Sequence, residues 1–169
     1  MILAVLVVIS TNVGNIKVQL DEKHAPVTVA NFLKYVKEHH YDGTVFHRVI
    51  KGFMIQGGGL DEKLHEKGAN FPPIKNESGN GLKNVPGAIA MARTNDPNSA
   101  TDQFFIDTHD NSFLDRAPGY AVFGKVVSGM DVVRKIENTK TGSKPSADGA
   151  PMSDVPMQNV VIKTIRIGK

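Results

Sequence analysis

Apolar and polar positions alternate at the start of the chain. Residues 3–9 are almost wholly apolar, and Ile16, Val18 and Leu20 alternate with polar residues. A period of two is typical of strands, and residues 12–15 between the two segments have the composition of a turn. The pattern therefore predicts a β-hairpin at the beginning of the chain.

A helical period follows this hairpin. Pro26 occupies a position that is tolerated in the first turn of a helix, and Gly43 marks the end of the segment. The adjacent His39 and His40 point in different directions on a helix, so we interpret them as solvated residues near its C-terminus and not as metal ligands. The predicted helix is amphipathic, and its apolar stripe consists of Val29, Phe32, Leu33 and Val36.

The rest of the chain is predicted to form short strands and one further helix. Ser128 is a candidate N-cap for a helix with Val132, Val133 and Ile136 on one side. Two long segments, 57–86 and 139–156, lack a period and are predicted to be loops. Strands are expected at 88–92, 103–106, 122–127 and 160–167. Many short strands with two helices favour a mainly β fold, a closed barrel with covered ends.

Residues 46–59 combine a permanent cation with apolar residues and end in three glycines. Because alternate residues of a strand share a face, we expect Arg48 to stand beside Phe46 and Ile50. A planar guanidinium with five donors would then lie among apolar side chains. The alternative is an arginine at the surface of an edge strand, followed by a glycine turn.

Residues 53–56 alternate in the same way. Met54 and Gln56 are expected on one face, and Phe53 and Ile55 on the other. Together with the preceding arginine, such a surface suits an extended, neutral ligand that is rich in hydrogen-bond acceptors, such as a peptide.

Composition indicates one globular domain over residues 1–169. Hydrophobic residues make up 40% of the chain and charged residues 22%, and there is no cysteine. Disulfides and thiolate chemistry are therefore excluded, and a reducing compartment fits. The net charge of +3 is small and no basic run occurs, so we do not expect nucleic acid as a ligand.

The apolar run at residues 2–9 is too short to cross a bilayer. A signal peptide would have a basic residue before such a run and a small-residue cleavage site after it, and this chain has neither. We therefore expect a buried first strand in a cytoplasmic protein that does not associate with membranes. A trimmed export signal is the alternative.

Three blocks of the sequence, in this order, resemble a known family. The first is Phe-His-Arg-Val-Ile and Gly-Phe-Met-Ile-Gln-Gly-Gly within residues 46–58. The second is Gly-Ala-Ile-Ala-Met-Ala-Arg-Thr at 87–94 with Gln-Phe-Phe-Ile at 103–106, and the third is Phe-Leu-Asp at 113–115 with Tyr-Ala-Val-Phe-Gly-Lys-Val at 120–126. They resemble the cyclophilins, the cyclosporin-binding peptidyl-prolyl cis-trans isomerases, in their bacterial branch. The resemblance covers nearly the whole chain and implies a closed eight-stranded antiparallel β-barrel capped by two α-helices.

The resemblance also implies roles for individual residues. Arg48 would be catalytic. Phe53, Met54, Phe105 and Leu114 would hold a proline ring. The residues expected to bind substrate are Phe53, Met54, Gln56, Ala92, Arg93, Thr94, Gln103, Phe105, Phe113, Leu114 and Tyr120.

Within this set, Gln56 would hydrogen-bond the substrate backbone and Gln103 would border the groove. Phe113 would lie at the edge of the proline pocket, and the backbone of residues 92–94 would pair with an extended peptide. Phe104 alternates away from its neighbours, so we interpret it as a core residue.

The chemistry of X-Pro bonds explains why such a site would need an arginine. Rotation takes tens to hundreds of seconds unaided over a barrier of about 18–20 kcal/mol, and ordinary enzymatic turnover requires a reduction of about 4–7 kcal/mol. Twisting makes the proline nitrogen more basic, so a donor aimed at it binds the transition state better than the ground state. Arg48 is always charged, and its hydrogen bond would contribute about 1.5–3 kcal/mol. An apolar pocket would supply the rest.

No proton transfer is required for this rotation, so we interpret His47 as structural and not as a base. We also expect neither a cofactor nor a metal ion.

Three residues depart from the pattern of many eukaryotic cyclophilins. Phe113 stands in place of a tryptophan, Arg93 in place of an asparagine and Tyr120 in place of a histidine. Phenylalanine lacks the indole N–H that donates to cyclosporin, so we expect cyclosporin to bind weakly. Arg93 adds a second cation near the groove and could favour acidic residues beside the X-Pro pair.

The expected function is thus peptidyl-prolyl isomerisation in proline-containing peptides and in unfolded or folded client proteins, by a monomer. The alternative is a proline-peptide-binding module or chaperone with little turnover. Arg48 favours the isomerase, because binding alone would not need a donor aimed at the imide nitrogen.

Overall fold

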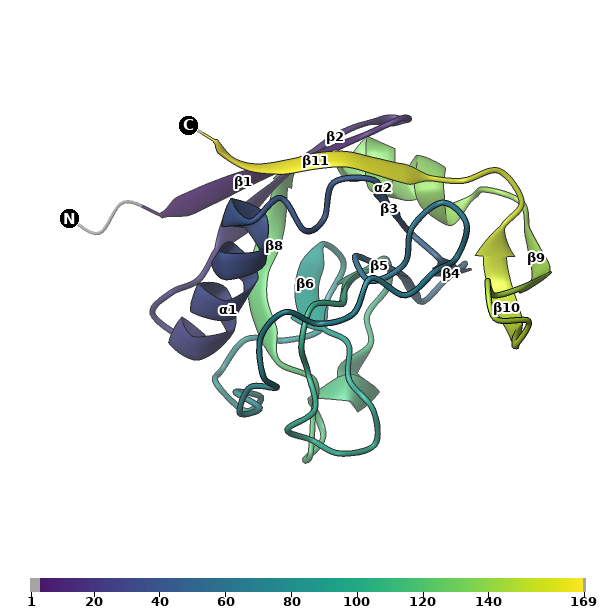
Figure 1. Ribbon diagram of the computed structural model, residues 1–169. Coiled ribbons are helices and arrows are strands. Elements are labelled where there is room, and N and C mark those ends of the chain that lie inside the picture. Colours follow the sequence, from purple (N-terminus) through teal and green to yellow (C-terminus); the bar gives the residue numbers. More distant parts are fainter. Residues whose placement is uncertain (1–3, 169) are drawn as a thin grey trace.

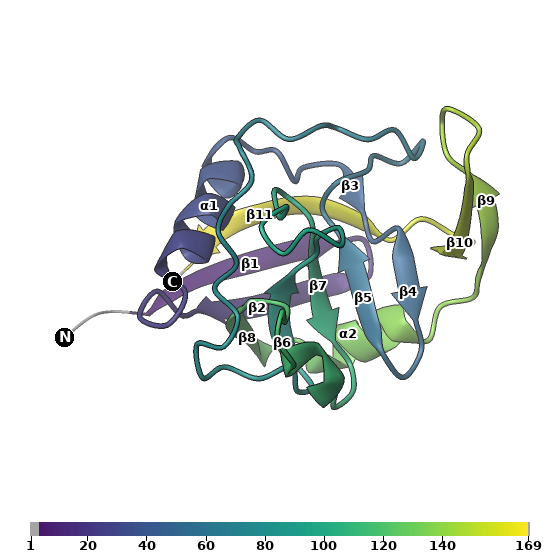
Figure 2. The same cartoon turned by 90° about the horizontal axis from the view of Figure 1, so that it is seen from below.

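A computed structural model describes residues 4–168, in which nine strands form one curled antiparallel sheet. The order across the sheet is β3-β11-β1-β2-β8-β6-β7-β5-β4 (Figures 1 and 2). The strands are β1 (Val5–Thr11), β2 (Gly14–Leu20), β3 (Thr44–Val45), β4 (Arg48–Ile50), β5 (Met54–Gly57), β6 (Ala88–Met91), β7 (Phe104–Asp107), β8 (Val122–Ser128) and β11 (Val161–Gly168). The mainly β fold is therefore confirmed.

The barrel is open, which corrects the expected closed barrel of eight strands. Its two edge strands, β3 and β4, are separated only by Phe46 and His47, but they do not pair with each other. The backbone N–H of Phe46 donates instead to the carbonyl of Val160, and the Phe46 side chain is buried in the core. Phe46 thus does not share a face with Arg48, because Phe46 lies in the link between the two strands and not in a strand itself.

The N-terminal hairpin is confirmed. Thr11 pairs with Gly14, which leaves a two-residue turn, and the alternating residues Ile16, Val18 and Leu20 are buried. Leu3, which was expected to begin the first strand, lies outside the described residues.

Two α-helices flank the sheet on opposite sides, α1 (Pro26–Lys37) and α2 (Met130–Glu137) (Figures 1 and 2). Ser128 does not cap α2, contrary to expectation, because it is the last residue of β8. The N-cap is Gly129 at φ +95°, a conformation that glycine adopts without strain. Within residues 4–168, neither helix is long and apolar enough to cross a bilayer.

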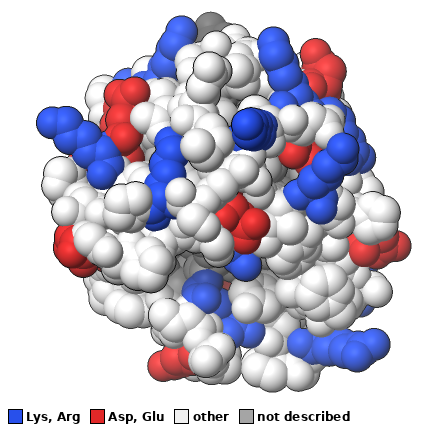
Figure 3. All heavy atoms as spheres, turned by 90° about the vertical axis from the view of Figure 1, so that its right-hand side faces the viewer, with Lys and Arg blue, Asp and Glu red and all other residues white. Residues whose placement is uncertain are grey.

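The segment 139–156 was expected to be a loop but contains a hairpin of β9 (Thr141–Pro145) and β10 (Pro151–Pro156). Proline is tolerated in edge strands, and both strands of this two-stranded sheet are edges. On the face shown in Figure 3, basic and acidic side chains are interspersed.

Strands β5, β6 and β7 are buried on both faces. Their inward residues, such as Ile55, Ile89 and Phe104, belong to the main core. Their outward residues form a second apolar cluster, which comprises Met54, Ala88, Ala90 and Phe105 together with Leu114 and Val122. The interpretation of Phe104 as core is confirmed, and the second cluster supplies an apolar floor on the outside of the sheet.

The long segment between β5 and β6 lacks named helices and strands, as predicted, and it is anchored to α1 through Glu77. One Glu77 carboxylate oxygen accepts hydrogen bonds from the backbone N–H and the hydroxyl of Thr28, each at 2.6 Å. The other accepts from the N–H of Val27 at 3.3 Å. The helix has Ala25 at its N-cap and no side-chain cap of its own, so a distant carboxylate performs this role.

We expect Glu77→Ala to lower the free energy of unfolding by about 1–2 kcal/mol, because N–H groups at the start of α1 lose their acceptor. Denaturant unfolding measures the change. Glu22→Ala, which removes an exposed carboxylate, is the matched control and should cost less than about 0.5 kcal/mol. Equal effects of the two substitutions would contradict the capping role.

Candidate active site

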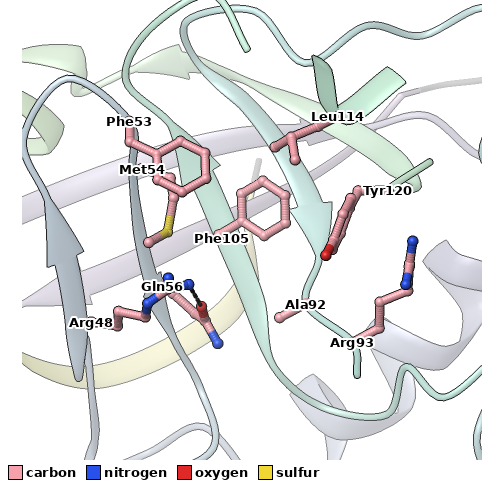
Figure 4. Close-up of a pocket in the computed structure, with 9 residues that line it drawn as sticks. All are labelled: Arg48, Phe53, Met54, Gln56, Ala92, Arg93, Phe105, Leu114 and Tyr120. Atoms are coloured by element: carbon pink, nitrogen blue, oxygen red, sulfur yellow. Dashed lines mark hydrogen bonds between the residues drawn. The ribbon is translucent and has the colours of Figure 1, made fainter. Parts of the chain in front are cut away.

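A cavity of about 190 Å³ opens over the second apolar cluster, on the outer face of the sheet (Figure 4). Strands β5, β6 and β7 supply its floor, and the η1 turn of 3₁₀ helix (Ser112–Asp115) and the segment after it cover one side. Its lining residues are Arg48, Phe53, Met54, Gln56, Ala92, Arg93, Phe105, Leu114 and Tyr120.

One part of the cavity is apolar. The Phe105 and Met54 side chains are almost wholly buried beneath it, and the Phe105 ring meets the Tyr120 ring edge to face with centroids 5.9 Å apart. Phe53 and Leu114 border the same part (Figure 4). Phe53 was expected on the face opposite Met54, but it lies in the turn before β5, where strand alternation does not apply.

The other part of the cavity is polar. Arg48 on β4 stands opposite Gln56 on β5, and its guanidinium donates to the Gln56 side-chain oxygen over a long distance of 3.4 Å. The Gln56 amide in turn donates to the side-chain oxygen of Gln103 at 3.0 Å. These hydrogen bonds link Arg48, Gln56 and Gln103. The exposed cation of Arg48 thus lies with Gln56 beside the apolar part of the cavity (Figure 4).

Arg93 lies across the cavity from Arg48 (Figure 4). Its guanidinium donates to the carbonyls of Thr94, Pro118 and Gly119, and it stacks over the Tyr120 ring at 4.2 Å from the ring centroid. The hydrogen bonds and the cation–π contact fix the segment that carries Tyr120. Arg93 therefore braces a wall of the cavity, a role that its sequence position did not indicate.

The remaining predicted residues lie around this cavity. Thr94 and Gln103 line an adjoining depression of about 240 Å³. Phe113 is 54% exposed, and its ring centroid lies 5.7 Å from that of Phe53 at the rim. The structure thus brings all the predicted residues together, although Thr94, Gln103 and Phe113 do not line the main cavity.

The fold and this cavity agree with comparisons to known proteins. The family model described as cyclophilin-type peptidyl-prolyl cis-trans isomerase/CLD matches residues 6–167. A peptidyl-prolyl cis-trans isomerase of Acinetobacter baylyi is 50% identical over 167 residues, which cover 97% of this chain and 88% of the relative. The chain belongs to the cyclophilin family.

Other cyclophilin relatives support the same assignment. Peptidyl-prolyl cis-trans isomerase B of Escherichia coli is 48% identical over 163 residues, covering 93% of this chain and 99% of the relative. A cyclophilin-type isomerase of Cryptosporidium parvum, crystallised in the presence of the dipeptide Ala-Pro, is 31% identical with a TM-score of 0.83, covering 97% of this chain and 99% of that one. The present chain is therefore an enzyme of the isomerase class. The two relatives that are 48–50% identical to it are bacterial.

His47 precedes Arg48 in the link between β3 and β4 of this cyclophilin. It is 6% exposed, and its Nδ1 atom has no hydrogen-bond partner in the described residues. Burial, with a smaller contribution from the charge of Arg48, lowers the pKa of His47 to about 4. The imidazole is therefore neutral at physiological pH and faces the interior.

Sequence reasoning missed two buried pairs of polar side chains. His40 was expected to be solvated, but its Nε2 atom pairs with the Asp102 carboxylate at 2.8 Å, and both side chains are buried. Asp107 and Asn111, under the cavity, are also buried and hydrogen-bonded to each other. The available signal for this second pair was Asp107 itself, a charged residue at the end of an otherwise apolar strand. In residues 4–168 no group of three potential metal ligands occurs.

We expect the stability advantage of this cyclophilin over a His47→Gln variant to increase as pH rises from about 4 to about 6.5. The unfolded histidine binds a proton in this range and the folded one does not, so lowering the pH favours unfolding of the wild type. The advantage should change by up to about 3 kcal/mol, measured by denaturant unfolding at several pH values. An exposed control, His109→Gln, should show no such trend, and an advantage of His47 that does not depend on pH would contradict the buried neutral imidazole.

Proposed function

We propose that this cyclophilin accelerates X-Pro rotation by directing the Arg48 guanidinium at the imide nitrogen of a proline seated in the apolar part of the cavity. The observation that carries the proposal is an exposed cation beside an apolar pocket. In residues 4–168, no carboxylate pairs with Arg48, and its guanidinium donates to the side chain of the neutral Gln56 at a long 3.4 Å. Most of its donors are thus free to meet a substrate.

The apolar part suits a proline ring. Met54, Phe105, Leu114 and Phe53 offer only carbon and sulfur to it. A ring held there stays fixed while the acyl side of the bond rotates past Arg48. Because the twisted amide is less polar than the planar one, desolvation by these side chains also favours the transition state. The relative that was crystallised in the presence of Ala-Pro supports a prolyl ligand.

The peptide backbone would pair along residues 92–94. The N–H of Ala92 already donates to the carbonyl of Gln103, and the N–H of Thr94 donates to the Ser99 hydroxyl. Alternate N–H groups of an extended segment point to opposite sides, so Arg93 presents its N–H outward. A substrate strand would therefore hydrogen-bond to the backbone of Arg93, with the Gln56 side chain on its other flank.

The substrates would be proline-containing peptides and client proteins whose X-Pro bonds can reach an open cavity. The protein would act as a monomer, since the large apolar residues that are exposed within residues 4–168 come from six different elements and loops: Val27, Val85, Phe113, Val127, Met157 and Ile167. Cyclosporin would bind weakly, because Phe113 at the rim has no N–H to donate.

Substitution of Arg48 by alanine tests the catalytic role. We expect kcat/KM for a short X-Pro peptide to fall by about two decades, since a charge-assisted hydrogen bond to the transition state is lost. Peptide affinity should change much less. Lys51→Ala removes a nearby exposed cation and should leave both quantities unchanged. An Arg48→Ala enzyme that folds and retains full activity would contradict the proposal.

Peptides that differ in one flanking residue test the role of Arg93 in specificity. We expect kcat/KM to be about two- to fivefold higher with glutamate than with lysine beside the X-Pro pair, because the exposed part of the guanidinium attracts a carboxylate weakly. The difference should shrink in high salt. Equal rates for the two peptides at low salt would show that Arg93 only braces the wall through Tyr120.

A further inference from the structure

Asp107 ends β7 on the face that forms the pocket floor. It stands directly opposite Met54 in the β5–β7 register, and Phe105 two residues earlier points the same way. Its side chain is fully buried. One carboxyl oxygen, Oδ1, accepts a hydrogen bond from Asn111 at 2.7 Å, while Oδ2 has no partner in residues 4–168. Burying an ionised carboxylate that has a single hydrogen-bond donor costs more free energy than burying the neutral carboxyl, because the charge loses its solvation.

Asn111 connects this carboxyl to two walls of the pocket. The Asn111 side-chain amide donates both to Asp107 and, at 2.9 Å, to the carbonyl of Phe53. The carbonyl of Asn111 accepts from the N–H of Leu114, also at 2.9 Å. The side chains of Phe53 and Leu114 line the cavity from different parts of the chain. Asn111 therefore ties both walls to the end of β7, the Phe53 wall through its side-chain amide and the Leu114 wall through its backbone carbonyl.

The charged groups around Asp107 disfavour its ionised form. Asp115 on η1 is held by the Asn84 backbone and side chain, and its negative charge acts on Asp107. From α2, Arg134 donates to the carbonyl of Thr108 and is paired with Glu137, so its charge is already balanced.

Among residues 4–168, no other neighbour supplies a cation that offsets a negative charge on Asp107. His109 and Asp110, two and three residues further along the chain, are exposed, and Met54, which faces Asp107 on β5, is apolar. Burial raises the pKa of Asp107 to about 7 with a smaller contribution from the charge of Asp115, and together they outweigh the hydrogen bond from Asn111, which favours the ionised form.

We propose that Asp107 is a positioning residue for the proline pocket: its neutral carboxyl, acting through Asn111, holds Phe53 and Leu114 in place, and its ionisation releases them. The carboxylate must acquire water or other donors at Oδ2, which requires segment 108–114 to move away from the floor. The inference rests on the proposed role of the pocket in holding proline. Because the ring contacts both walls in the ground state and in the transition state, loosening them raises KM more than it lowers kcat.

The test is the pH dependence of KM and kcat for an X-Pro peptide between about pH 5.5 and about pH 8.5, in the wild type and in Asp107→Asn. Asparagine keeps the shape and the acceptor for Asn111 and cannot ionise. We expect wild-type KM to rise about three- to tenfold through about pH 7, and the variant to keep the low-pH value throughout.

Two controls identify the titrating group. Asp110→Asn and His109→Gln remove neighbouring exposed titratable side chains and should leave the wild-type profile unchanged. The proposal is overturned by a flat wild-type profile, by an Asp107→Asn profile that still rises, or by loss of the rise in His109→Gln. If Asp107→Asn fails to fold, a carbon NMR titration of the wild-type Asp107 carboxyl decides instead: a midpoint near 7 supports the proposal, and a midpoint near 4 overturns it.

Peptide binding to Arg48→Ala separates this inference from the proposed function. The dissociation constant should keep the same dependence on pH, because Asp107 acts on the pocket and not on the guanidinium. An active Arg48→Ala enzyme would contradict the catalytic proposal and leave the Asp107 result standing. A dissociation constant that does not vary with pH would contradict the Asp107 proposal alone.

Discussion

The register of three short strands is the constraint on which the active site depends. Arg48 faces Gln56 across β4 and β5, and Gln56 faces Phe105 across β5 and β7. A slip of one residue in β5 would exchange its two faces, and would put Ile55 in the cavity and Gln56 in the core. The same hydrogen bonds that make the sheet therefore also set the cation beside the apolar floor.

The two faces of the sheet have different roles, because the inward face packs the main core and the outward face lines the cavity. The inward face carries the large aromatic core around Phe104, which gives the strands a fixed frame. The outward face carries the small Ala88 and Ala90, which leave room above the floor, and the adjustable Met54. Arg48 can stay exposed and weakly paired, because the core that stabilises the strands does not include its side chain.

The sequence alone was sufficient for the elements with a strong period, but not for contacts between distant residues. The first hairpin, both helices and the faces of Met54 and Gln56 followed from periodicity. Alternation failed at Phe46 and Phe53, because these residues lie in links and turns where no period operates. The buried pairing of His40 with Asp102 depends on a partner 62 residues away, which no local pattern reveals.

The central claim is that Arg48 acts on the twisted amide and not on binding. The most direct test is NMR exchange spectroscopy of an X-Pro peptide on the enzyme, which reports the rate of interconversion of the bound cis and trans forms. With Arg48→Ala at saturating protein, this account predicts that the bound exchange rate falls by about a hundredfold while the populations of the bound forms are kept. An unchanged exchange rate in the bound state would contradict it.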